Sequence, residues 1–427
     1  MPSLQVNTNT GSVPFYDREI NFRSILLAFI IFPLIKPSSA ALIVLFGSST
    51  GELITSLLSN WNILSIALTI ILFFGSFGNR IKPNVIDFCF AVVMVASLSI
   101  GTFIFHVFRL SSLVSIVLNI ILIFMLGVVF ESELDTYVSV FYRYIYLIMF
   151  FNSLSIYTFF PKGMYVGGMG FDNSNYYLFG LDNVGFLISI VGTFLGGLLP
   201  YLNPPKYSHK TYYLKHIIIS IFILGAFFYV RAGTGMAIIT LYAIIYLLIL
   251  FRKLPKINYR LVILFLLTSF MSIVILNTLG FFEPVLNLIG KDATFSGRTS
   301  IWAAGLRGVL DSPIFGHGIE AEITMSTLAQ YGPYWVANAG HLHNVILEYL
   351  FKGGVVSLLS FLGILALPLF SRQTIDESND CYQLLLYDIV LLWLVVMFEY
   401  RLEISIFWLL FIINYRLPYF FSFETKD

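Results

Sequence analysis

Long apolar runs separated by short polar breaks constrain this chain more than any other feature. A helix needs about 20 apolar residues to cross the hydrocarbon core of a bilayer, and about twelve runs come close to that length. Only 11% of the residues are charged, against about 25% in an average soluble protein. Most of the surface of such a chain must therefore contact lipid and not water. We expect an all-α integral membrane protein. The runs centre on residues 24–46, 61–78, 86–105, 112–130, 143–160, 183–202, 216–231, 234–251, 260–281, 345–370, 384–399 and 402–418.

Two places in this series are irregular. Pro33, Lys36 and Pro37 interrupt the first run, and only Tyr400 and Arg401 separate the last two. The one long polar interruption covers residues 282–343. We therefore expect a single polytopic membrane domain over residues 1–427, in which residues 282–343 form a long loop with short helices and carry part of the active site.

The distribution of Lys and Arg predicts the orientation of the bundle. If the N-terminus is cytoplasmic, most basic residues of the short loops fall on the cytoplasmic side, with strong clusters at 203–215 and 252–260. Cytoplasmic loops of membrane proteins carry this excess. We expect both termini in the cytoplasm and residues 282–343 on the periplasmic or exterior side. No ATP is present there, so chemistry on that side needs an activated, lipid-delivered substrate or an ion gradient.

Composition also argues against two classes of partner. The formal net charge is only +1, whereas nucleic-acid-binding proteins usually carry a basic patch. Cys89 and Cys381 have no CxxC or CxxH partner, so we expect neither a zinc site nor a disulfide framework.

Two arginines are candidates for binding an anion. Arg231 lies in a short hinge between two apolar runs, beside Gly233 and Gly235; a charge at that depth is costly and often functional, although an arginine snorkelling to the interface is the alternative. Arg298 precedes an amphipathic run at 301–307 that resembles a short surface helix, which Ser296 could cap. A helix N-terminus with an arginine suits an anion, while a solvated loop arginine is the alternative. Together the two guanidinium groups suit a pyrophosphate.

Two histidines directly before the run at 345–370 are candidates for acid–base chemistry. His341 and His343 are two apart, and Asn344 follows at the expected helix start. A histidine near neutral pH can act as general base toward a sugar hydroxyl; a structural interface histidine is the alternative. Glu320, Glu322 and Glu348 are close in sequence, but no third ligand has a recognisable metal spacing, so we expect no metal.

Two further segments contain residues that suit sugars. Tyr331, Tyr334 and Trp335 could form a platform for sugar rings, although aromatic residues also gather at membrane interfaces for other reasons. The loop at 161–182 contains Asp172 and Asn175, whose side chains could hold sugar hydroxyls; a flexible turn is the alternative.

Several separated motifs, in order, resemble the signature region of the O-antigen ligase/polymerase superfamily, which includes the Wzy-type polymerases. The motifs are Ser296-Gly297-Arg298 with Trp302, Ser312-Pro313 with Gly316-His317-Gly318, His343-Asn344 with Leu347-Glu348, Gly353-Gly354, and the Arg231-x-Gly233 hinge. They cover about residues 229–360. The rest of the chain resembles the family only in helix count and hydropathy.

The resemblance implies glycosyl transfer on the outer face of the bacterial cytoplasmic membrane, by a helical GT-C-like bundle without metal or other cofactor. The donor would be a glycan linked to undecaprenyl pyrophosphate. Arg231 and Arg298 would hold the pyrophosphate, and His343 would activate or position the acceptor hydroxyl, with His341 as the alternative. Asn344 and Glu348 would be weaker substrate contacts. A chain-length regulator and a flippase are the expected protein partners.

The sequence favours one of three functions. A polymerase would transfer the growing glycan onto the next lipid-linked repeat, and a ligase would transfer it onto the lipid A core. A core-binding ligase should present a basic face to phosphates, yet the long loop has only Lys291, Arg298 and Arg307, which favours the polymerase. A flippase or transporter, the third class, should carry charges or broken helices near the membrane midplane.

Overall fold

The fold is a bundle of helices, as the apolar runs predict. The computed structural model describes residues 22–76, 85–105, 109–166, 175–202, 209–229, 233–250, 253–276, 279, 281, 297–370, 377 and 379–424. The first half contains α1 (Phe22–Ile31), α2 (Ser39–Phe46), α3 (Ser48–Ser76), α4 (Ile86–Ile104), α5 (Leu110–Ser112), η1 (Leu113–Val117), α6 (Leu118–Val129), η2 (Glu131–Glu133), α7 (Leu134–Phe159) and α8 (Asp182–Leu202). The second half contains α9 (His209–Tyr229), α10 (Gly233–Leu250), α11 (Tyr259–Phe270), η3 (Met271–Leu276), α13 (Arg298–Val309), α14 (Ala321–Tyr331), η4 (Tyr334–Asn338), α15 (Val345–Phe370), α16 (Asp380–Glu399), η5 (Ser405–Trp408) and α17 (Leu409–Glu424).

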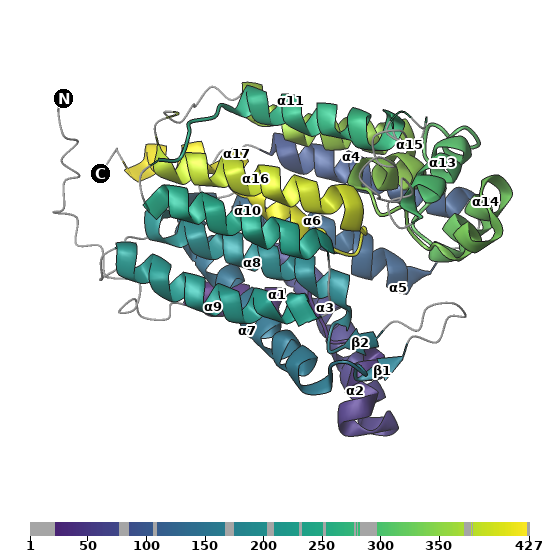
Figure 1. The fold of residues 1–427 in the computed structure, drawn as a ribbon, viewed down its shortest axis with the longest axis horizontal. Coiled ribbons are helices and arrows are strands. Elements are labelled where there is room, and N and C mark those ends of the chain that lie inside the picture. Colours follow the sequence, from purple (N-terminus) through teal and green to yellow (C-terminus); the bar gives the residue numbers. More distant parts are fainter. Residues whose placement is uncertain are drawn as a thin grey trace.

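The long helices run side by side along the longest axis of the molecule (Figure 1). The short helices α13 and α14 gather at one end, on the right in that view, whereas α17 ends at the opposite end. Residues 282–343 thus contribute, in their described part, a small helical cap on one end of the bundle.

Six helices in the described part of the chain are long and apolar enough to cross a membrane. A seventh span results if the bent pair Leu113–Val129 and Glu131–Phe159, which turns by 77°, counts as one, and four shorter apolar helices are also present. The chain is therefore a multi-pass, all-α membrane protein, while the number of about twelve spans stays a prediction.

The first apolar run is interrupted at the prolines, as the sequence indicated. Helix α1 ends at Ile31, just before Pro33, and α2 begins at Ser39. Proline lacks the N–H group that a helix interior needs, and its ring clashes with the preceding turn. The hydroxyl of Ser38 then accepts a hydrogen bond from the N–H of Ala41 and caps α2.

A small antiparallel sheet follows α7, in the segment expected to be a loop. It consists of β1 (Tyr165–Val166), β2 (Asn175–Tyr177) and β3 (Gly180–Leu181), in the order β1-β2-β3. It joins the break between α1 and α2, where the N–H of Ser38 donates to the carbonyl of Leu178 and the hydroxyl of Tyr165 donates to Ser38 Oγ at 2.6 Å.

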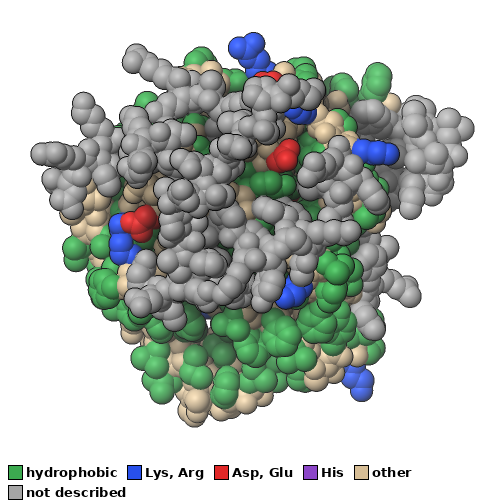
Figure 2. Space-filling model, turned by 90° about the vertical axis from the view of Figure 1, so that its left-hand side faces the viewer, with side chains coloured by type: hydrophobic (Ala, Val, Ile, Leu, Met, Phe, Trp, Pro, Cys, Tyr) green, Lys and Arg blue, Asp and Glu red, His purple; other side chains and the backbone are tan. Residues whose placement is uncertain are grey.

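A buried ion cluster joins three elements at the end away from α13, and a partly exposed ion pair beside it adds a fourth. Arg416 of α17 is fully buried and contacts Asp87 of α4 at 2.6 Å and Glu131 of η2 at 3.1 Å. Arg23 of α1 pairs with Glu133 of the same turn. Figure 2 looks onto this end of the molecule and shows Lys and Arg side chains distributed around it.

Helix α15 is broken at Gly354, and the segment 313–318 packs into the break. Gly354 has φ 67° and ψ −167°, so the helical hydrogen bonds stop there. Four backbone hydrogen bonds join the two segments: His317 and Gly318 donate to the carbonyls of Phe351 and Lys352, and Val355 and Val356 donate to the carbonyls of Pro313 and Ile314. The backbone groups freed by the break are thus paired, as an apolar environment requires.

This contact explains two of the glycines in the motifs. A Cβ atom on Gly354 would collide with the backbone of Ile314, and one on Gly316 would collide with the backbone of Lys352. Both glycines also have positive φ angles, 67° and 65°, which side chains disfavour. The turn at 313–318 is therefore a structural joint between the cap and α15.

Candidate active site

The two histidines of the sequence motif lie side by side at the start of α15. Leu342 between them is fully buried, and its backbone is bonded on both sides. Its N–H donates to Glu348 Oε2 at 2.7 Å, and its carbonyl accepts from Trp302 Nε1 at 3.0 Å. With Leu342 held in this way, the rings of His341 and His343 stand with their centroids 3.9 Å apart.

The backbone around His343 is also fixed. His343 has a φ of 53°, which is uncommon for a residue other than glycine and points to a constrained position. Asn344 caps α15, since its Oδ1 accepts from the N–H of Leu347 at 3.1 Å. Its Nδ2 donates to the carbonyl of Met397 at 3.1 Å, which links the histidine loop to α16.

Two guanidinium groups border the histidines. Arg298 begins α13 and pairs with Glu399, the last residue of α16; their side chains are only 18% and 8% exposed. Arg401, two residues further on, donates from Nε to Nε2 of His341 at 3.1 Å. The residue before α13 is Gly297, in the left-handed conformation, and Ser296 lies outside the described residues.

Burial and these cations keep both imidazole groups neutral. Burial first, and then Arg298 and Arg401, lower the pKa of His343 to about 3. Burial, Arg401 and His343 lower the pKa of His341 well below its usual range. At neutral pH the guanidinium groups of Arg298 and Arg401 therefore lie beside two neutral rings, with Glu399 paired to Arg298. Such a site favours an anion with several oxygens, because each arginine can donate two parallel hydrogen bonds.

A second ion pair, on α15 next to the histidine loop, has no net charge. Lys352 contacts Glu348 at 2.8 Å, one helical turn apart, and both side chains are buried. Glu348 and Asn344, expected as weaker substrate contacts, thus bond to the protein itself. In this structure they position the histidine loop, and a contact of either with substrate stays a prediction.

The other candidate residues from the sequence have fewer described contacts with the histidine cluster, or lie outside the described residues. Trp335 lies over Gly297, where a Cβ atom would be 2.7 Å from the tryptophan ring, so it borders Arg298. Tyr334 is 81% exposed. Arg231 and Asp172 lie outside the described residues, and Asn175 belongs to β2, with its side chain not described.

Sequence reasoning missed Glu399 and Arg401 as members of this site. Both lie at the short break between the last two apolar runs, where Glu403 is a further charge. A charged turn of that kind resembles the hinge at Arg231, which was singled out for the same reason. That break predicts a charged turn but not its partners, which lie 101 and 60 residues away in the sequence.

Comparison with known proteins bears on the same region. Residues 219–362 match a family model described as O-antigen ligase. A stretch of 118 residues is 25% identical to the exopolysaccharide production protein ExoQ of Rhizobium meliloti (strain 1021) and covers 26% of this chain and 27% of that protein. The matched family region includes Arg298, both histidines and the joint at Gly354. The part of the chain that assembles these motifs around one cluster therefore resembles the O-antigen ligase/polymerase superfamily.

Proposed function

We propose that this protein is a polysaccharide polymerase, a glycosyltransferase that elongates lipid-linked glycans. The donor is a glycan on undecaprenyl pyrophosphate, and the acceptor is a hydroxyl of the next lipid-linked repeat unit. The observation that carries the proposal is the cluster of Arg298 and Arg401 around two neutral imidazole groups at the capped end of the bundle.

The cluster suits the charge changes of that reaction. The acceptor oxygen attacks the anomeric carbon of the donor, the bond from that carbon to the phosphate oxygen breaks, and the lipid pyrophosphate leaves with the electron pair. Arg298 and Arg401 stabilise the added negative charge, and one such preplaced donor is typically worth about 3 kcal/mol. Glu399 holds Arg298 in place until the pyrophosphate competes for the guanidinium group.

The acceptor proton passes to His343 in this scheme. In the free protein an imidazole with a pKa of about 3 is a weak base. A bound pyrophosphate offsets the charges of Arg298 and Arg401 and thereby raises the proton affinity of the imidazole. The base therefore becomes effective when the donor is in place. His341, held by Arg401, orients the pair, and Arg231 remains a candidate second ligand of the pyrophosphate.

Two observations favour the polymerase over the related ligase. The similar Rhizobium protein is named for exopolysaccharide production. The long loop has only Lys291, Arg298 and Arg307 as basic residues, and Arg298 already pairs with Glu399. A surface for the phosphorylated lipid A core should carry more positive charge.

The proposed setting is the bacterial cytoplasmic membrane, with both termini in the cytoplasm and the cluster on the outer face. The lipid-linked repeat arrives there through a flippase, and a chain-length regulator limits elongation. Transport by this chain itself is the alternative from another class, which should carry charges near the membrane midplane.

The test uses a strain that lacks the gene and the lipid-linked repeat extracted from it. Such a strain should accumulate single repeats, and the purified protein should convert the extract into a ladder of products. Long glycan stranded on undecaprenol in the strain would instead identify a ligase. Unchanged substrate that only crosses the bilayer of a proteoliposome would identify a transporter.

A further inference from the structure

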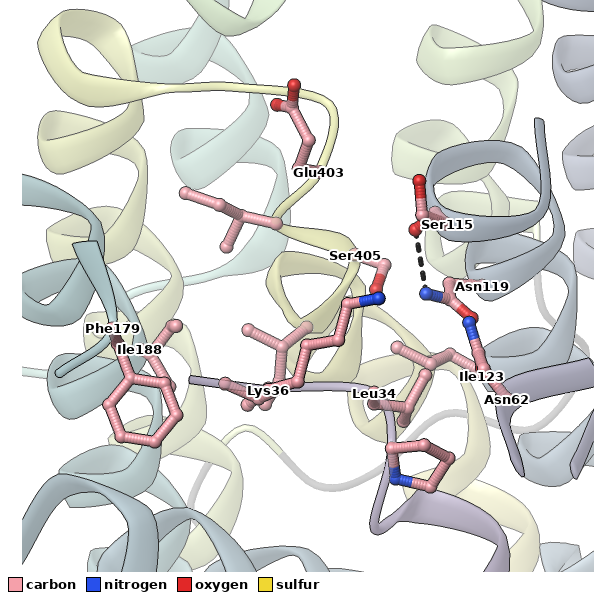
Figure 3. A pocket seen from close by; sticks show the side chains of 14 residues that line it. Leu34, Lys36, Asn62, Ser115, Asn119, Ile123, Phe179, Ile188, Glu403 and Ser405 are labelled. Carbon is pink, nitrogen blue, oxygen red and sulfur yellow. Dashed lines mark hydrogen bonds between the residues drawn. The ribbon is translucent and has the colours of Figure 1, made fainter. Parts of the chain in front are cut away.

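A cavity of about 300 Å³ lies between the N-terminal helices and the turn that follows α16. Figure 3 shows Lys36, Asn62, Ser115, Asn119, Glu403 and Ser405 around it, with Leu34, Ile123, Phe179 and Ile188 as apolar neighbours. Small-molecule sites occupy about 300–1,000 Å³, so this cavity has room for one compact group. No described residue of the motifs around the histidine cluster lines this cavity.

Two amide groups in the wall have acceptor atoms without a partner. The Oδ1 atoms of Asn62 and Asn119 are buried and accept no hydrogen bond, and the side chains are only 3% and 4% exposed. Asn119 uses its Nδ2 to donate to the carbonyl of Ser115 at 2.7 Å, which holds the amide in place. Both residues line the cavity together with Ser115 and Ser405, so this part of the wall offers neutral amide and hydroxyl groups to a ligand.

The charges on the cavity wall agree with an uncharged ligand. Lys36 donates to Ser59 Oγ at 3.0 Å and is one cation, while Glu403 at the exposed rim is one anion. A phosphate or carboxylate would meet one cation and one anion among the described lining residues, without an excess of positive charge to bind it. A sugar hydroxyl both donates and accepts, and the apolar face of a sugar ring can pack on an aromatic ring such as Phe179.

One short segment connects the cavity to the histidine cluster. Glu399 pairs with Arg298 and Arg401 bonds to His341, while residues 403–406 form part of the cavity wall. A ligand in the cavity and an anion at the arginines would therefore contact the same turn from its two ends.

We propose that this cavity binds one uncharged, hydroxylated sugar ring of the lipid-linked glycan. The inference rests on the proposed function, because it takes the glycan as the substrate. It assigns the pyrophosphate to the arginines and the sugar ring to the amides of Asn62 and Asn119. These two residues bind and position the glycan and do not take part in the bond changes.

The first test measures elongation kinetics with the lipid-linked repeat extracted from the deletion strain. Asn62→Leu and Asn119→Leu keep side-chain size but remove the acceptors. Each variant should raise KM about tenfold, which is the loss expected for one well-placed hydrogen bond. The kcat should stay within about threefold of the wild type, because the lost contact binds the substrate and the transition state equally. Asn414→Leu is the matched control, since Asn414 is also buried but does not line the cavity; it should behave as the wild type.

The second test does not depend on turnover. In a Cys89→Ser background, Glu403→Cys places a thiol at the rim, and the extracted repeat should slow its reaction with a maleimide. Unchanged KM in both amide variants, or labelling that the repeat does not slow, would overturn the cavity assignment. If the wild type forms no polymer while the repeat still protects the thiol, the proposed reaction fails and the binding site stands.

Discussion

At the scale of single residues, the pairing of Arg298 with Glu399 makes a specific prediction. Arg298→Ala removes one of the two guanidinium groups that would face the leaving pyrophosphate. We expect kcat/KM for elongation to fall about 100- to 1,000-fold, the usual effect of losing such a donor. Arg298→Lys should also be strongly impaired, because lysine lacks the planar fork. Arg307→Ala is the control: it lies on the same helix, is exposed and bonds only weakly to the carbonyl of Tyr331. Equal activity of Arg298→Ala and Arg307→Ala would contradict the assignment.

The lowered pKa of His343 predicts how stability depends on pH. In the folded protein the pKa is about 3, and in the unfolded chain it is about 6.5. Between these values the unfolded state binds more protons, so stability contributed by the neutral imidazole is present above pH 6.5 and is lost as the pH falls toward 3. The Tm of the purified protein should therefore drop between pH 7 and pH 5, and His343→Gln should make this drop smaller. A variant with the same pH profile as the wild type would show that the imidazole is not buried among cations.

The sequence alone identified part of this cluster and missed the rest for a physical reason. Arg298, His341 and His343 belong to short motifs with a recognisable spacing. Glu399 is 101 residues from the arginine with which it pairs, and Arg401 contacts His341 across 60 residues. Such partners depend on how α13, α15 and α16 pack, and local patterns contain no information about that packing.

At the scale of elements, the joint between the segment 313–318 and α15 predicts the effect of a single methyl group. Gly354→Ala would place a side chain on a residue with a positive φ, which is disfavoured, and its Cβ atom would collide with the backbone of Ile314. Gly47→Ala is a matched control, because Gly47 also has a positive φ, 84°, but open space around it. Backbone strain alone costs about 1–3 kcal/mol, so Gly354→Ala should lower the Tm more than Gly47→Ala and should also abolish elongation. Similar Tm losses in the two variants would mean that the joint is not tightly packed.

The two helix breaks differ in whether the sequence alone predicts them. The break after α1 was predictable, because Pro33 and Pro37 are incompatible with a helix interior. The break at Gly354 was not, since a Gly-Gly pair within an apolar run is compatible with a continuous helix. Its partner, the turn at 313–318, lies about 40 residues earlier and becomes its neighbour only in the folded protein. The short sheet at 165–181 was likewise hidden, because its strands are only two or three residues long.

At the scale of the whole molecule, the two ends of the bundle differ in charge chemistry. One end holds Arg416 fully buried between Asp87 and Glu131, an arrangement in which the arginine charge is compensated within the protein. The other end holds Arg298 paired with Glu399, and Arg401 bonded to the ring of His341. In the second arrangement Arg401 bonds to an imidazole and not to a carboxylate, so its guanidinium group can attract an incoming anion. Helix α4 runs between the two, from Asp87 at the ion cluster to Thr102, whose Oγ1 accepts from the N–H of Ile319 beside the cap.

The capped end of the bundle should face the outside of the cell. Tyr334 is highly exposed on the capped end, whereas Lys256 is exposed in the turn between α10 and α11, near the start of α16 and far from its last residue, Glu399. In a Cys89→Ser background, Tyr334→Cys should react with a membrane-impermeant maleimide in intact cells once any outer membrane is made porous. Lys256→Cys should react only after the cytoplasmic membrane is permeabilised, because the basic loops stay inside. The reverse pattern would place the arginines and histidines in the cytoplasm, away from any glycan displayed outside, and the proposed reaction would have no substrate there.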